Sequence, residues 1–387
     1  MPKCILITLL VFLSACRSLP PEYLSGQQIE NLSREEVSKQ YPLTAWEYSY
    51  IGEYQKSLAA FDQYYQVTDQ VIKRPKITLP ERFVTGDARE YIIGKSVETR
   101  VVMINEAHHQ PMHRVFTESL LEELYEKGFR FLALEALVSD SRINESKVLT
   151  LHDGYYTKEP QFGNLIHKAL ALGYHVFGYE YTDKDISREL GQAKNILQVL
   201  NQNPGAKILV HCGFNHLVEE KHPDGIRTMA QELRLLTGID PLTVDQVQFS
   251  EHSRTDFEHS LYRFFEVNSP SVLLDNDARL LPLKGENSVV DLRVIHPKTQ
   301  FIHGRPAWLY RNGTWKNCFL PDQGKNTRFP CTVFAYKQDH ADFRNVPTDI
   351  IEINSPGEKA LVLPPGKFKV YIRDRAGKVI HTVMEVK

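Results

Sequence analysis

The sequence predicts an α/β fold with a mostly parallel sheet and flanking helices, between an N-terminal helical segment and a C-terminal all-β, sandwich-like module. Two patterns carry this prediction. From about residue 98, short and nearly all-apolar runs alternate with longer stretches of helical periodicity, which is typical of a parallel sheet covered on both faces. From about residue 283, strand-like runs are separated by turn signals such as Asn312-Gly313 and Pro364-Pro365-Gly366, which favours a small β-sandwich.

The N-terminus has the pattern of an export signal. Lys3 precedes a short apolar run that ends in Leu13-Ser14-Ala15-Cys16. This run is too short for a transmembrane helix, which needs about 20 apolar residues, and small residues before a cysteine resemble the bacterial lipobox. We therefore expect a signal peptide over 1–15 and lipidation of Cys16, which would anchor the protein to a membrane of the cell envelope, facing the periplasm or the exterior. An ordinary secretory signal cut nearby is the alternative.

A linker and a helical segment are expected next. Residues 16–32 include Pro20-Pro21 and few apolar anchors, so we interpret them as a lipidated linker. Ser33-Arg34-Glu35-Glu36 has the spacing of a capping box. Apolar residues then recur at helical spacing from Trp46 to Tyr65. We predict a helical segment over 33–90 that packs on the main domain.

The α/β domain is predicted over 91–282 and the β-module over 283–387. Right-handed crossovers in the α/β domain would align the C-terminal ends of its strands along one edge of the sheet. The expected strands of this domain are 100–104, 129–135, 174–180 and 206–211, with helices at 111–127, 162–172, 183–201 and 224–236. The expected strands of the module are 288–294, 331–336, 349–354 and 367–372.

Composition limits the partners and the thiol chemistry. The chain of 387 residues is 42% hydrophobic and has a formal net charge of −2, so it lacks the basic surplus with which proteins bind nucleic acid. Cys318 and Cys331 lie close together in a region rich in Pro, Gly and Asn, and an exported protein would join them in a disulfide. Cys212 is then expected as a buried thiol.

Glu and His residues follow four consecutive strands. In parallel α/β sheets, ligands bind beyond the carboxyl ends of the strands. Because these positions follow apolar strands, their carboxylates should be partly buried and need cationic or hydrogen-bonding partners. We therefore predict a functional site at this edge. Its candidates are Glu106, His108, His109, His113, Arg114, Glu135, Glu180, His211 and His216.

Structural roles compete with functional ones at several of these positions. His108 would only cap the following helix, and His211 favours a structural role. Glu180 would serve either the site or an ion pair with Arg114 or Arg142. His109 and His113 are four residues apart, which places both on one helix face. Tyr155-Tyr156 would line a substrate cleft or anchor their loop.

Three segments resemble the erythromycin-esterase and ChaN-like superfamily, over residues 95–250. Ile104-Asn105-Glu106-Ala107-His108-His109 resembles its Gly-Glu-x-x-His signature, although Asn105 stands where the family has glycine. Leu132-Ala133-Leu134-Glu135 is similar to its second acidic strand end. Val210-His211-Cys212-Gly213-Phe214-Asn215-His216 is similar to its Gly-x-x-His element.

The resemblance implies a hydrolase of an ester or amide bond in a small molecule or peptide. In the metal-free form, typical of erythromycin esterases, His109 would be the general base and Glu106 or Glu135 would orient it. We expect the catalytic set to be Glu106, His109, Glu135 and His216. We expect Arg114, Tyr155 and Glu180 to contact the substrate.

Two other chemistries remain open within this family. In the form typical of Tiki-type peptidases, a Zn or Mn ion would lower the pKa of a bound water. In ChaN-type envelope lipoproteins, Tyr and His side chains hold haem iron, which is the alternative to catalysis. The sequence has neither His-Glu-x-x-His nor Gly-x-Ser-x-Gly, which argues against a zincin and a serine hydrolase. The expected metal ligands are Glu106, His109, His113, Glu135 and His216.

Overall fold

The structure is a computed structural model that describes residues 23–34, 42–65, 83–219, 225–277, 279–281, 289–320 and 327–387. The expected signal peptide and its Cys16 lie outside the described residues. Within the ranges given above, no helix is long and apolar enough to cross a membrane.

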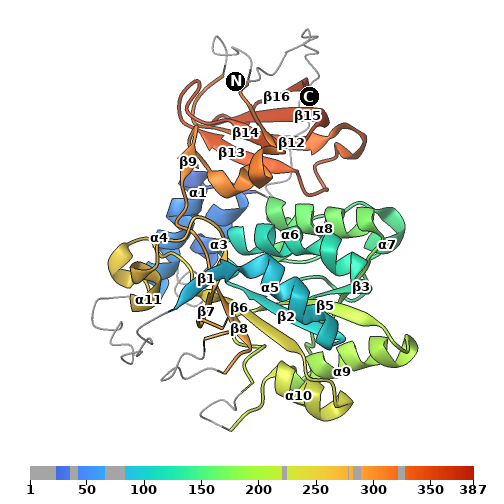
Figure 1. The fold of residues 1–387 in the computed structure, drawn as a ribbon. Coiled ribbons are helices and arrows are strands. Elements are labelled where there is room, and N and C mark those ends of the chain that lie inside the picture. Colours follow the sequence, from blue (N-terminus) through green and yellow to red (C-terminus); the bar gives the residue numbers. More distant parts are fainter. Residues whose placement is uncertain are drawn as a thin grey trace.

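A mostly parallel sheet of eight strands forms the centre of the molecule, in the order β1-β7-β8-β6-β2-β5-β3-β4 (Figure 1). The six strands from β8 to β4 run parallel, and β7 is antiparallel to both of its neighbours. This confirms the predicted fold class. The strands are β1 (Val84–Asp87), β2 (Val101–Glu106), β3 (Phe129–Leu134), β4 (His175–Gly178), β5 (Lys207–Gly213), β6 (Leu242–Phe249), β7 (Ser271–Leu274) and β8 (Leu292–Ile295).

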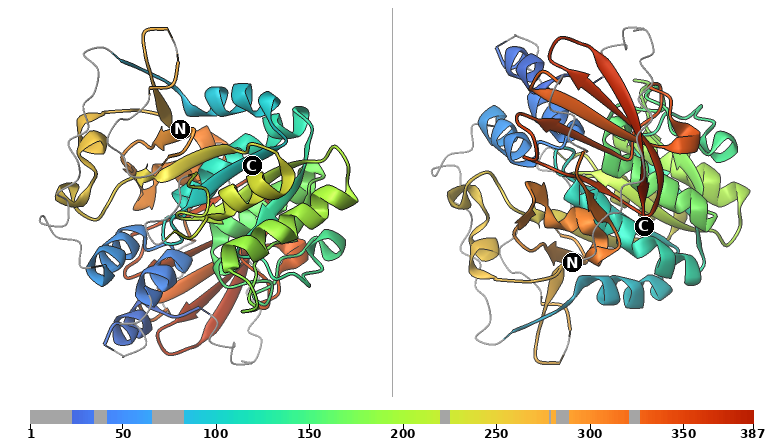
Figure 2. Two further views of the ribbon diagram at one scale, coloured as in Figure 1. Left: turned by 90° about the horizontal axis from the view of Figure 1, so that it is seen from below. Right: turned by 90° about the horizontal axis from the view of Figure 1, so that it is seen from above.

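Helices cover both faces of this sheet, as Figures 1 and 2 show. Successive side chains of a strand point to opposite faces. Accordingly, Val102 and Ile104 of β2 pack with α6 and α8, whereas Val101 and Met103 pack with α9 and α10. The helices are α5 (Ala88–Lys95), α6 (Met112–Glu126), α7 (Ile143–Ser146), α8 (Pro160–Leu172), α9 (Arg188–Gln202), α10 (Met229–Thr237) and α11 (Ser260–Phe264).

Local sequence explains where these helices begin and end. Helix α8 starts with Pro160 in its first turn, its N-cap Glu159 accepts a hydrogen bond from the Phe162 amide, and Gly173 ends it in the left-handed conformation. Short 3₁₀ helices connect other elements. They are η1 (Ser96–Glu98), η2 (Tyr156–Lys158), η3 (Thr255–Phe257), η4 (Ala307–Gly313) and η5 (Gln338–His340).

The N-terminal helical segment differs from the prediction at its start. It consists of α1 (Gly26–Leu32), α3 (Leu43–Tyr50) and α4 (Tyr54–Tyr64). The interpretation of 16–32 as linker is wrong for α1, which begins at a capping box between Ser25 and Gln28. Ser33 is instead the C-cap of this helix. The Gly26 amide donates a 2.7 Å hydrogen bond to Glu352, so α1 is docked on the C-terminal module.

The C-terminal module is antiparallel, with strands β13-β12-β15-β16 in one sheet and β11-β14 in a second, and a shared apolar core (Figure 1). A small hairpin, β9–β10, precedes it. The strands are β9 (Phe301–Ile302), β10 (Arg305–Pro306), β11 (Lys316–Cys318), β12 (Cys331–Lys337), β13 (Asp349–Ile353), β14 (Leu361–Leu363), β15 (Gly366–Asp374) and β16 (Val379–Val386).

Two expectations for this region are corrected. The strand expected at 288–294 belongs to the central sheet rather than the module, because β8 pairs in parallel with β6. No disulfide joins Cys318 and Cys331, and both side chains are buried thiols. They lie on strands of different sheets, β11 and β12, and pack into the common core as small apolar groups.

Candidate functional site

The strand ends that carry the predicted candidates are neighbours in the sheet. Strands β2, β5, β3 and β4 lie side by side and run parallel. Glu106 is the last residue of β2, Glu135 directly follows β3, and Glu180 comes two residues after β4. The structure therefore brings Glu106, Glu135, Glu180 and His216 to one edge, as the sequence predicted.

Glu106 is the centre of a buried polar cluster. Its carboxylate accepts hydrogen bonds from Nε and Nη2 of Arg114 at 2.6 and 2.8 Å, and contacts His211 Nε2 at 2.9 Å and His108 Nδ1 at 2.8 Å. Burial alone would raise the pKa of Glu106, but the Arg114 charge and these hydrogen bonds hold it well below its usual value. Glu106 is therefore a fixed, ionised carboxylate.

Arg114 belongs to this cluster and not to a substrate surface. It is fully buried and also donates to Glu159 at 3.0 Å and to the His108 carbonyl at 2.9 Å. Its guanidinium lies over the Phe162 ring, 4.8 Å from the ring centroid. The expected contact of Arg114 with substrate is therefore corrected: this arginine neutralises and orients Glu106.

His108 connects Glu106 to the surface. Its Nδ1 faces the ionised Glu106, so Nδ1–H donates to that carboxylate, and the tautomer with its proton on Nδ1 has a lone pair on Nε2. Among the described residues, Nε2 has no hydrogen-bond partner. The ring stacks on Tyr156, with 3.9 Å between centroids, and meets Phe214 edge-on at 5.2 Å. The structure thus presents an oriented imidazole between two aromatic rings.

The end of β5 is shaped around this imidazole. A Cβ atom on Gly213 would lie 2.6 Å from the His108 ring and 3.0 Å from a Glu135 oxygen, so only glycine fits there. The Gly213 amide donates to Glu135 at 2.5 Å. The next residue, Phe214, has a φ of +36°, a strained value for a side chain of this size. This backbone places both the Glu135 carboxylate and the Phe214 ring beside His108.

A second charged group lies next to His108, around Arg188 at the start of α9. Arg188 donates to Glu135 at 2.7 Å and to Glu180 at 2.9 Å, and its side chain is 47% exposed. The partner of Glu180 is therefore Arg188, not Arg114 or Arg142. Together with the buried Glu135, the half-exposed guanidinium forms the polar side of the candidate site.

His216 completes this charged group. Its Nδ1 lies 2.8 Å from Glu189 and its Nε2 lies 3.6 Å from Glu135. Burial would lower its pKa, but the hydrogen bonds and charges of these two carboxylates raise it to about 9. His216 is therefore cationic near neutral pH, and its 3.1 Å approach to Arg188 Nη1 is a contact between two cations.

The two histidines predicted as a pair lie in the core instead. His109 is buried and stacks on Phe61 with 3.6 Å between ring centroids, and burial, its largest influence, lowers its pKa. His113 accepts a hydrogen bond from the Ala107 amide at 3.0 Å, and its buried Nε2 has no partner in the described chain. The structure therefore places His109 in the core, stacked on Phe61, and not beside the exposed polar groups of the candidate site.

Tyr155 anchors its loop. Its ring makes edge contacts with Trp46 at 5.6 Å and Tyr50 at 6.0 Å, and it is 39% exposed. The adjacent Tyr156, noted with Tyr155 in the sequence, is the ring that contacts His108. Of the two open alternatives for Tyr155, its contacts favour the anchor.

The expected metal ligands do not converge. In the part of the chain that the structure describes, no group of three or more His, Cys, Asp or Glu side chains is arranged to hold a metal ion. The physical reason is that arginine side chains, and not a metal ion, balance the charge of these carboxylates. Arg114 pairs with Glu106, and Arg188 pairs with Glu135. The predicted set of Glu106, His109, His113, Glu135 and His216 is therefore not a metal site in this structure.

Sequence reasoning undervalued two residues of the site and missed a third. His108 and His211, which it favoured as structural, both contact Glu106 directly. The sequence did contain a signal for His108. Residues two apart in an extended strand point to the same side, so Glu106 is expected to face His108 rather than His109. Arg188 had the weaker signal of a basic residue directly after a helix N-cap, Ser187.

Comparison with known proteins finds only distant structural likenesses. No known protein family matches the sequence, and no curated protein is significantly similar to it. Three similar solved structures are the type III effector HopBA1, the MARTX toxin effector domain RRSP of Vibrio vulnificus, and ChaN of Campylobacter jejuni, solved with cofacially bound haem. Their identities to this chain are 12%, 18% and 12%, and their TM-scores are 0.35, 0.29 and 0.27.

The extent of these matches differs. They cover 58%, 57% and 47% of this chain, in the same order, and 98%, 43% and 95% of HopBA1, RRSP and ChaN. The chain thus spans less than half the length of RRSP. At these similarities none of the three assigns a function to this protein.

Proposed function

We propose that the protein is a hydrolase of ester or amide bonds in which His108, oriented by Glu106, activates the attacking water. The observation that carries the proposal is the 2.8 Å contact between His108 Nδ1 and the buried, ionised Glu106, while Nε2 has no hydrogen-bond partner among the described residues. An imidazole held in one tautomer by a carboxylate is the arrangement that general-base catalysis requires.

The cluster behind His108 supports this role. Taking a proton from water makes the His108 ring cationic, and the Glu106 charge at Nδ1 stabilises that cation. Arg114 and His211 hold the carboxylate from its other sides, so Glu106 cannot turn away during the reaction. General-base catalysis of this kind contributes about 10²–10⁴-fold in rate.

Arg188 supplies the positive charge that hydrolysis needs. The carbonyl oxygen of an ester or amide becomes negative when water attacks, and fixed positive groups stabilise that charge. Arg188 is half-exposed and is held beside Glu135, whose other oxygen accepts the Gly213 amide next to His108. Tyr156 and Phe214 would form the apolar walls for a small-molecule or peptide substrate.

Haem binding, the alternative drawn from the sequence, has weaker support. An iron-bound tyrosine is a phenolate, and burial raises the pKa of Tyr156 well above its usual value, which opposes that form. A haem titration read at the Soret band nevertheless separates the two functions. A stoichiometric Soret shift that disappears in His108→Ala would favour a haem carrier over the hydrolase.

The cellular location proposed with this function is the cell envelope. It is supported by the Leu13-Ser14-Ala15-Cys16 sequence alone. Replacing Cys16 by Ser should release the protein from the membrane fraction of the native host. Unchanged membrane association of that variant would contradict lipidation at Cys16.

The central test is a screen of ester and amide substrates with the full chain and matched variants. His108→Gln should lower kcat/KM by about 100-fold or more, because Gln cannot accept the proton of water. Glu106→Gln should have a similar effect through the lost orientation of His108. The control is His109→Gln, the neighbouring residue that stacks on Phe61, which should keep most of the activity if the fold is retained by circular dichroism.

The reverse pattern would refute the proposal. Loss of activity in His109→Gln together with full activity in His108→Gln would mean that His109, the residue expected from the sequence, is the general base. Activity that depends on added Zn or Mn and is lost on chelation would mean that the mechanism is metal-dependent.

A further inference from the structure

A second imidazole–carboxylate pair lies at the same end of the sheet, outside the site described above. His252 follows the end of β6 by three residues, and its Nδ1 lies 2.6 Å from Asp62 of α4. The second Asp62 oxygen accepts hydrogen bonds from the amide and hydroxyl of Ser253 at 2.8 and 2.5 Å. Asp62 is only 3% exposed. Neither Asp62 nor His252 stood out in the sequence.

This pair has the same chemical form as His108 on Glu106. Burial would raise the pKa of Asp62, but the hydrogen bonds from His252 and Ser253 lower it, so the carboxylate is ionised. The His252 Nδ1–H is then directed at Asp62, and Nε2 has no hydrogen-bond partner in the described parts of the chain. The His252 side chain is 23% exposed.

The two pairs lie along one edge with His109 between them. Strand β6 pairs in parallel with β2, and neighbouring strands are about 5 Å apart. Helix α4 places Phe61 on the His109 ring and the next residue, Asp62, on His252. After burial, the nearby His252 and His108 are among the groups that lower the pKa of His109. The outer two imidazoles therefore flank a neutral, buried one.

The two imidazoles differ in their surroundings. His108 lies between the rings of Tyr156 and Phe214, which cannot solvate a cation as water does. His252 is more exposed, and besides Asp62 the carboxylate of Glu258 is near enough to feel its charge. The neighbouring Glu251 is bound by Tyr54 and Thr299. His252 is therefore the more solvent-exposed of the two imidazoles.

We propose that His252, positioned by Asp62, is the general acid that protonates the leaving group in the hydrolysis. This rests on the proposed function, in which His108 is the base. His108 Nε2 takes a proton from water as the water oxygen bonds to the carbonyl carbon. The bond from that carbon to the leaving oxygen or nitrogen then breaks, and the leaving atom takes the proton from His252 Nε2. Proton exchange with solvent then removes the added proton from His108 and returns one to His252. The net reaction is therefore the addition of water across the bond.

The test compares two leaving groups on one acyl group that the full chain hydrolyses. A p-nitrophenolate leaves without protonation, whereas ethoxide needs a proton. His252→Gln should therefore lower kcat on the ethyl ester by about 100-fold and on the p-nitrophenyl ester by less than about threefold. It should also remove the alkaline limb from the pH profile of kcat. The control His152→Gln changes an exposed histidine of the 150–153 loop and should affect neither ester.

The Asp62→Asn variant tests whether Asp62 positions the His252 imidazole for proton transfer or only holds α4 in place. If Asp62 positions the acid, this variant should shift the alkaline limb and lower the rate on the ethyl ester more than on the p-nitrophenyl ester. If Asp62 and His252 only fasten α4, both variants would lower the melting temperature and slow both esters equally, which would overturn this inference but leave the proposed function intact. Full activity of His108→Gln, or a wild-type chain without hydrolysis of any ester or amide, would instead overturn the proposed function and this inference with it.

Discussion

Arg114 sets the charge balance beneath the candidate site. It is fully buried, and its guanidinium forms ion pairs with two buried carboxylates, Glu106 and Glu159. The charges of these carboxylates, acting against burial, raise the pKa of Arg114 further above its already high value. Because each charge is removed from water, no member of the cluster is stable without its partners.

Arg114→Met should therefore destabilise the protein by about 3–5 kcal/mol, since it leaves two buried carboxylates without a cation. Urea unfolding monitored by circular dichroism measures this change. Arg142→Met is the matched control, because Arg142 pairs with Glu145 on the surface, where the two side chains are 82% and 67% exposed. That variant should leave the midpoint unchanged. Equal effects of the two substitutions would contradict the buried cluster.

His216 should make the stability of the protein depend on pH. Its pKa is raised to about 9 in the folded chain from about 6.5 in the unfolded one. The stabilisation is therefore complete below pH 6.5 and is lost as the pH rises through 9. The free energy of unfolding should fall by roughly 2 kcal/mol between pH 6.5 and 9 in the wild type. His216→Gln should lack this component, and parallel pH profiles of the two proteins would contradict the assignment.

At this scale the sequence located the edge but not which histidine contacts Glu106. Apolar strands followed by Glu106, Glu135 and Glu180 were enough to predict a common edge, because parallel strands align their ends. The choice between His108 and His109 depends on the turn after β2, in which the Gln110 amide donates to the Ala107 carbonyl at 2.8 Å. No periodicity extends into such a turn, so the spacing of a resembling family signature pointed to His109, whereas the structure places His108 against Glu106.

Strand β5 positions the site through its last residue. Gly213→Ala should push the His108 ring and the Glu135 carboxylate away from the backbone, costing about 1–3 kcal/mol and most of the activity. The control is Gly94→Ala in α5, where nothing lies within 4 Å of the new Cβ. There the substitution should raise stability by about 0.5 kcal/mol through helix propensity. Melting curves and ester hydrolysis measure both variants, and an active Gly213→Ala would argue against the close approach of His108.

Elements with mixed polarity escaped the sequence analysis. Strand β6 contains Thr243, Asp245 and Gln246, all buried, which hides it from a search for apolar runs. These side chains are paired in the structure. Asp245 accepts a hydrogen bond from Asn105 at 2.9 Å, and the Gln246 side chain donates to the Asn105 carbonyl at 2.6 Å. Because β6 was not predicted, the sequence pattern offered no neighbouring strand that would place β8 in the central sheet.

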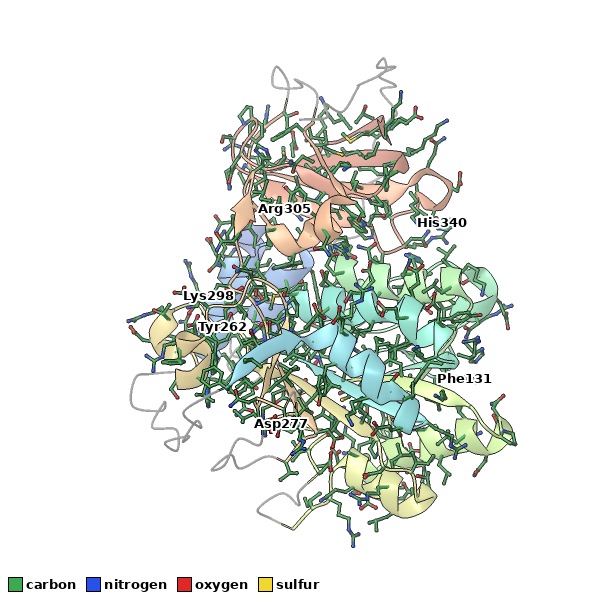
Figure 3. The ribbon with its side chains drawn as sticks, in the orientation of Figure 1. Phe131, Tyr262, Asp277, Lys298, Arg305 and His340 are labelled. Carbon is green, nitrogen blue, oxygen red and sulfur yellow. The ribbon has the colours of Figure 1, made fainter. Side chains whose placement is uncertain are left out.

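The whole molecule is joined by contacts between the α/β domain and the C-terminal module. One apolar cluster includes Phe162 and Leu149 of the domain together with Val346 and Ile350 of the module. Arg311 of the module donates to Glu118 of α6 at 2.8 Å. Figure 3 labels two further module residues at this boundary. His340 lies 6.4 Å from the His167 ring of α8, and Arg305 lies near Gly52 of the helical segment.

These shared contacts predict that the domain and the module unfold together. The module has an apolar core of its own, but residues of both parts also lie in one shared cluster, and unfolding either part would expose it. Two single-tryptophan chains test this. One keeps Trp46, which packs on Tyr155 and Tyr156 of the domain, and the other keeps Trp315, which lies under Arg311 of the module.

Urea unfolding followed by fluorescence should give the same midpoint and slope for both tryptophans, since both report one transition. Arg311→Gln should lower the two midpoints equally, because the lost bond to Glu118 joins the two parts. Arg344→Gln, which removes an exposed ion pair with Asp342 inside the module, is the control and should leave both midpoints in place. A Trp315 transition at lower urea than the Trp46 transition would mean that the module unfolds alone, and the boundary cluster would then hold the parts together without making them one cooperative unit.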